Sequence, residues 1–94
     1  MKALLKNKIL PLGCVVATPS ADDTLFSVEI EVVLRRHQNY DWGEVSEADW
    51  RSNNEAVLKG FRILSAYRST TGEKFWIITE AGRSVTTILL PSDY

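Results

Sequence analysis

The chain of 94 residues has a single cysteine, Cys14, and a single histidine, His37. One cysteine excludes a disulfide within the chain, and without a cluster of cysteine and histidine there is no ligand set for a structural zinc ion. The sequence also lacks a phosphate-binding glycine loop and paired catalytic carboxylates. We therefore expect no metal and no cofactor. A lone cysteine in an apolar run is more often a small buried hydrophobic side chain than a reactive thiol, but the sequence leaves open whether solvent reaches Cys14.

An excess of charge is also missing. Eleven basic and twelve acidic side chains give a formal net charge of −1, whereas a protein that neutralises nucleic-acid phosphates usually carries a basic excess. We therefore expect no nucleic-acid partner. No apolar run approaches the length of a membrane span, and lysines interrupt the first ten residues. We expect a cytoplasmic protein that does not bind membranes, with a flexible segment at residues 1–10.

What the sequence has in quantity is β-forming residues near its end. Residues 61–90 contain three runs rich in aromatic and β-branched side chains, separated by turn signals at Thr71-Gly72 and Ala81-Gly82. This pattern predicts an antiparallel three-stranded meander. Residues 12–18, which lie between two prolines, predict another strand at an edge of the sheet or beside the meander. Residues 19–24 are rich in turn formers and predict a loop.

Two segments between these strands predict helices. Residues 26–37 show both strand-like alternation and helical spacing, but acidic residues come first and Arg35 and Arg36 come last, which favours a helix with Ser27 as its N-cap. A clearer helix begins after Ser46, with Asp49 in its first turn, and ends at Gly60. Its expected inner face includes Trp50, Asn53 or Asn54, Val57 and Leu58.

These elements fit a single α+β domain over residues 1–94. We expect an antiparallel sheet of about four strands, made from the N-terminal strand and the C-terminal three-stranded meander, with one or two helices packed on one face.

Several motifs carry a resemblance to a known group. They are Arg36-His-Gln-Asn-Tyr-Asp-Trp-Gly-Glu-Val, Lys74-Phe-Trp-Ile-Ile-Thr-Glu and Arg83-Ser-Val-Thr-Thr-Ile-Leu-Leu. The chain resembles a family of small, mostly uncharacterised bacterial proteins carried on plasmids and integrative mobile elements. Gly82 departs from the charged residue expected there. The resemblance implies a mobile element that must survive host defence, and it supports a helix that ends at His37.

One interpretation of His37 is catalytic. Its ordinary pKa lies near neutrality, so with Arg62, Arg68 or Arg83 it would suit a metal-independent ribonuclease toxin on a RelE-like or barnase-like scaffold. The structural alternative, which we favour, is a histidine at a helix C-terminus that bonds to the following turn.

A second group of residues suggests binding. Trp42 lies in a loop, where an aromatic side chain either recognises a partner or packs into the core as a plug. Acidic residues surround Trp42 in the sequence. The candidate binding residues are Asp41, Trp42, Glu44, Glu47 and Asp49. Such an acidic face can meet a basic groove of another protein, although most acidic runs are only solvated helix faces.

The sequence thus predicts a non-enzymatic protein-binding module of a mobile genetic element, acting as an inhibitor of a host defence system. The alternative is the ribonuclease toxin. The expected partner is another protein of unknown identity. A homodimer that pairs through an exposed strand edge is a third option.

Overall fold

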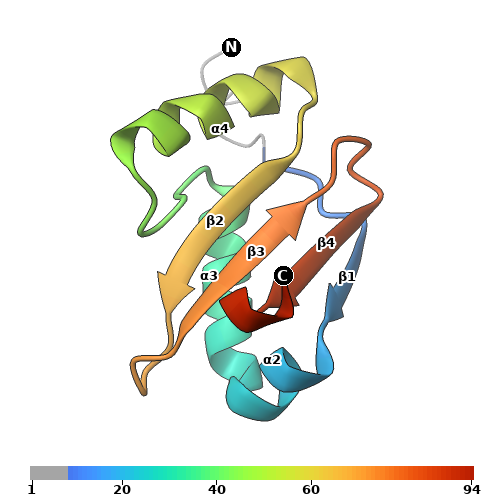
Figure 1. The fold of residues 1–94 in the computed structure, drawn as a ribbon. Helices are drawn as coiled ribbons and strands as arrows, with labels where there is room; N and C mark the ends of the chain where they lie inside the picture. Colours follow the sequence, from blue (N-terminus) through green and yellow to red (C-terminus); the bar gives the residue numbers. More distant parts are fainter. Residues whose placement is uncertain (1–8) are drawn as a thin grey trace.

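The computed structural model describes residues 9–94 and forms one four-stranded sheet with helices packed against it (Figure 1). The expected flexibility of residues 1–8 lies outside the described residues, whereas Leu10 is buried and donates its main-chain N–H to Gln38. The elements in chain order are β1 (Cys14–Ala17), α2 (Pro19–Thr24), α3 (Ser27–Gln38), α4 (Glu47–Lys59), β2 (Ile63–Arg68), β3 (Lys74–Thr79), β4 (Val85–Leu89) and η1 (Pro91–Asp93).

The sheet has the strand order β1-β4-β3-β2. The meander is confirmed: β2 pairs antiparallel with β3, and β3 pairs antiparallel with β4. The N-terminal strand is also confirmed at an edge, but β1 pairs with β4 in parallel, so the sheet is mixed rather than wholly antiparallel. The chain reaches β4 only after three helices and the first two strands of the meander, and this path brings it back in the same direction as β1.

The ambiguous segment is a helix, as the charge order favoured. The prediction of Ser27 as N-cap was wrong, because the cap is Phe26 and Ser27 is the first helical residue. Glu29 explains this start, since its carboxylate accepts the main-chain N–H of Phe26 at 2.8 Å. Val33 and His37 turn towards the sheet, so α3 is held by one narrow face.

The loop expected at residues 19–24 was also wrong, because this segment is the short helix α2. Thr18 caps it by accepting the main-chain N–H of Ala21, and Pro19 stands in its first turn, where a missing N–H does no harm. Residues that favour turns also favour helix starts, and this explains the error.

Helix α4 has both of its predicted ends. Ser46 accepts the main-chain N–H of Asp49 at 3.1 Å, and Gly60 closes the helix in the left-handed region at φ +78°. The predicted inner face is only partly right. Asn53 and Ala56 are buried, whereas Leu58 is 87% exposed.

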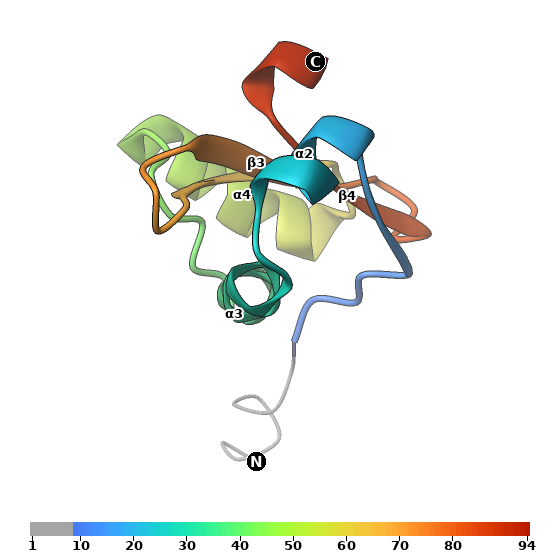
Figure 2. The ribbon, with the colours of Figure 1, turned by 90° about the horizontal axis from the view of Figure 1, so that it is seen from below.

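The main core lies between the sheet and α3, which covers one face of the sheet (Figure 2). Phe75, Ile77 and Ile88 pack there with Val33. A second cluster joins α4 to the same sheet face through Ala56 and Ile63. The opposite face carries η1 (Figure 2). The ring of Tyr94, which follows η1, packs edge-on against Trp76 with ring centroids 5.6 Å apart. Within residues 9–94, no helix is long and apolar enough to cross a membrane.

Candidate functional site

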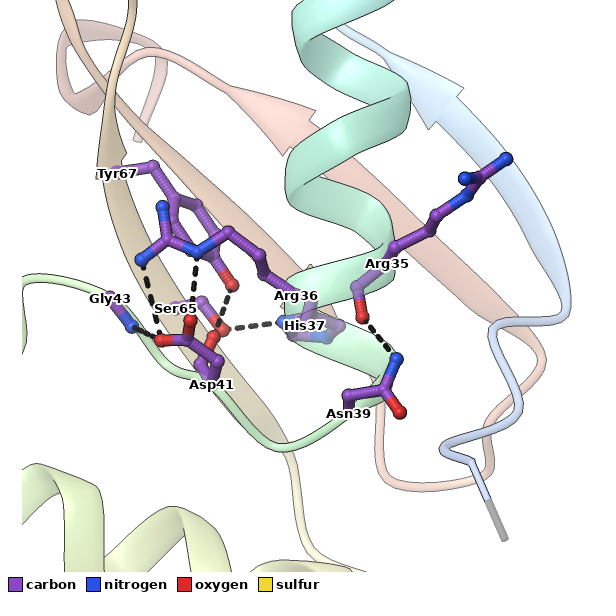
Figure 3. A network of polar contacts seen from close by, with 8 residues as sticks. All are labelled: Arg35, Arg36, His37, Asn39, Asp41, Gly43, Ser65 and Tyr67. Atoms are coloured by element: carbon purple, nitrogen blue, oxygen red, sulfur yellow. Dashed lines mark hydrogen bonds and ion pairs between the residues drawn. The ribbon is translucent and has the colours of Figure 1, made fainter. Parts of the chain in front are cut away.

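His37 lies in the core at the C-terminal end of α3. Its ring is fully buried and bonds through Nδ1 to the Ser65 hydroxyl (Figure 3). Nε2 bonds to the Thr79 hydroxyl, 2.8 Å away. Thr79 in turn lies 2.8 Å from the hydroxyl of Thr86, which donates to the carbonyl of Leu12. One chain of polar contacts therefore links α3, all three strands of the meander and the segment before β1.

The direction of this chain follows from its last bond. Each hydroxyl has one hydrogen, and the hydrogen of Thr86 goes to the Leu12 carbonyl. Thr79 must then donate to Thr86 and accept from Nε2–H of His37. A neutral ring protonated at Nε2 leaves Nδ1 to accept from Ser65. The network thus requires a neutral His37 in one tautomer.

The electrostatic environment agrees with that requirement. Burial, and secondly the positive charge of Arg83, lower the pKa of His37 from 6.5 to about 4. The ring is therefore neutral at pH 7, is shielded from solvent and has both nitrogens occupied. The expected bond to the following turn is replaced by bonds to strand hydroxyls. This geometry gives His37 a structural role and leaves it no route to an external substrate.

The three candidate arginines are not gathered around an open pocket with His37. Arg62 lies beside Tyr94, and Arg68 lies 3.1 Å from the carboxylate of Glu44. Arg83 donates to the main-chain carbonyls of residues 56 and 61, which ties the β3–β4 turn to the end of α4. Each therefore already has partners within the chain.

Trp42 is fully buried and plugs the loop into the core. Its Nε1–H donates to Asn54 at 2.9 Å, and its ring meets His37 edge-on and stacks on Tyr40. The plug interpretation of Trp42 is therefore the one that the geometry supports, and this side chain is not available to a partner protein.

Asp41 is engaged in the same loop (Figure 3). Its carboxylate lies 2.8 Å from Nε of Arg36 and accepts the main-chain N–H of Gly43, and these contacts, led by the Arg36 hydrogen bond, lower the pKa of Asp41. Burial raises the pKa of Tyr67 to about 12, and the Tyr67 hydroxyl donates to the Asp41 carbonyl. Asp41 therefore shapes the loop.

The remaining acidic candidates lie near basic partners or at a cap. Glu44 pairs with Arg68, and Glu47 pairs with Arg51 one helical turn further on. Asp49 stands in the first turn of α4, beside the Ser46 cap. The acidic face is thus largely balanced by neighbouring positive charge, which weakens it as an attractive surface for a basic protein.

The loop that contains Trp42 also closes one edge of the sheet. The main-chain N–H and C=O of Ala66 bond to Trp42 and Glu44, at 3.1 and 2.7 Å. Gly43 permits this approach, because its φ is +73° and an added Cβ would lie 2.0 Å from the Ala66 carbonyl oxygen. The side chain of Asn53 bonds to both main-chain groups of Leu64. The outer edge of β2 is therefore occupied at both residues.

The outer edge of β1 is open by contrast (Figure 1). The main-chain N–H groups of Cys14 and Thr18 donate to the carbonyls of Ser84 and Ile88, so alternation turns the N–H and C=O of Val15 and Ala17 away from the sheet. No group in residues 9–94 bonds to those outward atoms. All four residues of β1 are exposed, with Val15 and Val16 each at 42%.

The sequence analysis proposed pairing through an exposed strand edge but did not say which residues form that edge. The accessibility of Cys14, which the sequence left open, is settled by its position on β1, where it is exposed. The sequence feature that could have identified this edge is the run of residues 9–18, which carries no charged side chain. Natural edge strands are usually protected from pairing with other chains by charges, bulges or covering loops, and the uncharged apolar run at β1 has no charge to protect it.

Comparisons with known proteins add nothing to these observations. No family model, curated protein or solved structure matches the chain. Within residues 9–94 there is also no group of three or more histidine, cysteine or acidic residues placed to hold a metal ion.

Proposed function

We propose that this chain is a non-enzymatic protein-binding module that accepts an extended protein segment along the outer edge of β1. The observation that carries the proposal is the difference between the two edges of one sheet. The edge of β2 has the outward main-chain groups of Leu64 and Ala66 occupied, whereas the edge of β1 offers those of Val15 and Ala17.

Strand addition explains what such an edge recognises. Main-chain hydrogen bonds supply affinity without regard to sequence, and side chains on either face of the strand supply preference. Val15 and Val16 project to opposite faces and are partly exposed, so they would favour apolar side chains on the incoming strand.

The acidic loop and helix support the binding role less well than β1 does. Trp42 is buried, and Asp41 and Glu44 are paired with arginines. The resemblance to proteins of mobile elements remains the only support for the finer proposal, inhibition of a host defence system. A defence protein is accordingly the heterologous partner to look for.

The test is capture of partners from a nuclease-treated bacterial lysate by the tagged chain and two variants. Val15→Pro removes the outward N–H and places a ring on the edge, whereas Val15→Ala removes the same side chain and keeps the N–H. We expect a partner retained by the wild type and Val15→Ala and lost by Val15→Pro, with all three chains giving folded circular dichroism spectra.

Two results would contradict the proposal. Equal retention of the partner by all three chains would exclude the β1 edge as the binding surface. Recovery of no protein at all, including an untagged copy of this chain supplied in the lysate, would exclude the binding module itself.

A further inference from the structure

We infer that the segment bound by β1 is β1 of a second copy of this chain, paired antiparallel across a twofold axis that passes beside Val16. This inference rests on the proposed function and names the partner for that surface. Three features of residues 9–18 and their surroundings support it.

The first feature is the missing charge. In an antiparallel pair across a twofold axis, the residue at the axis faces its own copy, so a charge there repels the identical charge of the second copy. Residues 9–18 contain no charged side chain. The edge thus lacks the repulsion that prevents self-pairing, and it also lacks the charges by which a partner of opposite sign would be attracted.

The second feature is the length of the open edge. It is limited before Cys14 by Gly13, whose φ of +65° is not that of a strand, and after Ala17 by the start of α2 at Pro19. Antiparallel pairing centred on Val16 sets Val15 opposite Ala17 of the second copy, twice. Each opposed pair exchanges two hydrogen bonds, so all the outward groups of both edges are used.

The third feature is access. The chain before β1 leads towards α3, where Leu10 bonds to Gln38, and the chain after β1 forms α2, which packs against β4. Figure 1 shows both described segments turning away from the outer side of β1. A second strand can therefore lie along that side without meeting them.

The register has a consequence for side chains. The two copies of Val16 face each other as a non-hydrogen-bonded pair with Cα atoms about 4.5 Å apart, a favourable place for β-branched residues. The two copies of Cys14 lie about 13 Å apart along the strands, since each is two residues from the axis. That separation is too large for a disulfide.

The experiment is sedimentation velocity of the full chain over a wide concentration range, with charges placed at Val16. We expect the wild type to dimerise, and Val16→Lys and Val16→Glu each to weaken dimerisation by more than about tenfold. An equimolar mixture of the two variants should regain the dimer, because lysine and glutamate then face each other. Val28→Lys and Val28→Glu, on the exposed side of α3, should dimerise as the wild type does.

The register is tested by oxidation. Val16→Cys combined with Cys14→Ser should form an intermolecular disulfide, and the wild-type chain should not. A wild-type disulfide through Cys14 would overturn the proposed register. A dimer that survives both Val16→Lys and Val16→Glu would place the contact elsewhere.

The inference and the proposed function can fail separately. A wild-type chain that stays monomeric at every concentration, yet captures another protein through an edge sensitive to Val15→Pro, overturns the second-copy inference and supports the proposed function. A monomer that captures nothing overturns both. The mixture experiment also guards against misfolding, because only folded variants can regain the dimer together.

Discussion

The hydroxyl oxygen of Thr79 lies 2.8 Å from Nε2 of His37 in the closed interior of the protein. Since the Thr79 hydrogen points to Thr86, this oxygen is the acceptor for the histidine N–H. The two residues come from α3 and β3, so the bond fixes the helix to the middle of the sheet. Its removal should therefore be measurable.

Thr79→Val keeps the shape of the side chain and leaves the His37 N–H without an acceptor. We expect the free energy of unfolding to fall by about 1–3 kcal/mol, the range for a buried polar group left unpaired. Urea denaturation measures this change. Thr87→Val on the half-buried outer face of β4 is the matched control and should have a smaller effect. Equal effects of the two substitutions would contradict the network.

Acid should destabilise the protein through His37. The folded-state pKa of about 4 lies below the ordinary value of 6.5, so the unfolded chain binds the proton more readily. Stability from the neutral ring is complete above pH 6.5 and is lost as the pH falls towards 4, by an amount on the order of 3 kcal/mol. The window lies above the range in which Asp41 and Asp93, whose pKa values are lowered, begin to contribute.

An NMR titration of the His37 ring protons checks this directly. No titration should occur between pH 5.5 and 8. A midpoint near pH 6.5 would show a solvated ring and would contradict the buried network. A His37→Gln variant should lose the corresponding part of the pH dependence of unfolding.

Gly43→Ala should be strongly destabilising. The new Cβ would meet the Ala66 carbonyl in a conformation that already disfavours alanine, so we expect a loss of about 3 kcal/mol or more. Gly72→Ala is the control, because Gly72 also has a positive φ, +87°, but has open space around it. That variant should lose only about 1–2 kcal/mol. Thermal and urea unfolding of both variants give the comparison, and equal losses would contradict the close approach at Gly43.

Cys14 should react with a thiol reagent in the native state, because its side chain is exposed on β1. The rate at low protein concentration should approach that of the chain unfolded in urea. A thiol that reacts only after denaturant is added would show that β1 is covered in solution.

The meander was predictable because alternation and turns are local signals. The helical state of α3 was predictable for a similar reason, since acidic residues precede basic ones along it. The strand that pairs with β1 was not predictable, because the parallel pairing of β1 with β4 joins residues about 70 positions apart. The burial of Trp42 was equally hidden. A loop tryptophan has the same local sequence whether it faces a partner protein or Asn54 and His37.

The candidate site shows the same limit. His37 and Trp42 stood out because their residue types are rare in the chain, yet the structure encloses both of them. Val15 and Val16 had no such distinction. Their importance depends on which strand neighbours them and on what lies beyond that strand, and both facts belong to the assembled sheet.

The occupied edge of β2 sets a limit on growth. A protein whose sheet is open on both sides can add copies without end and form a fibre. Here the Gly43 bridge and the side chain of Asn53 occupy β2 at Ala66 and Leu64, so two copies joined through β1 would offer a third copy no β2 edge that is open along its length. A glycine and an asparagine far from β1 would thereby make the assembly finite, and their loss would turn a self-limiting pair into a seed for polymers.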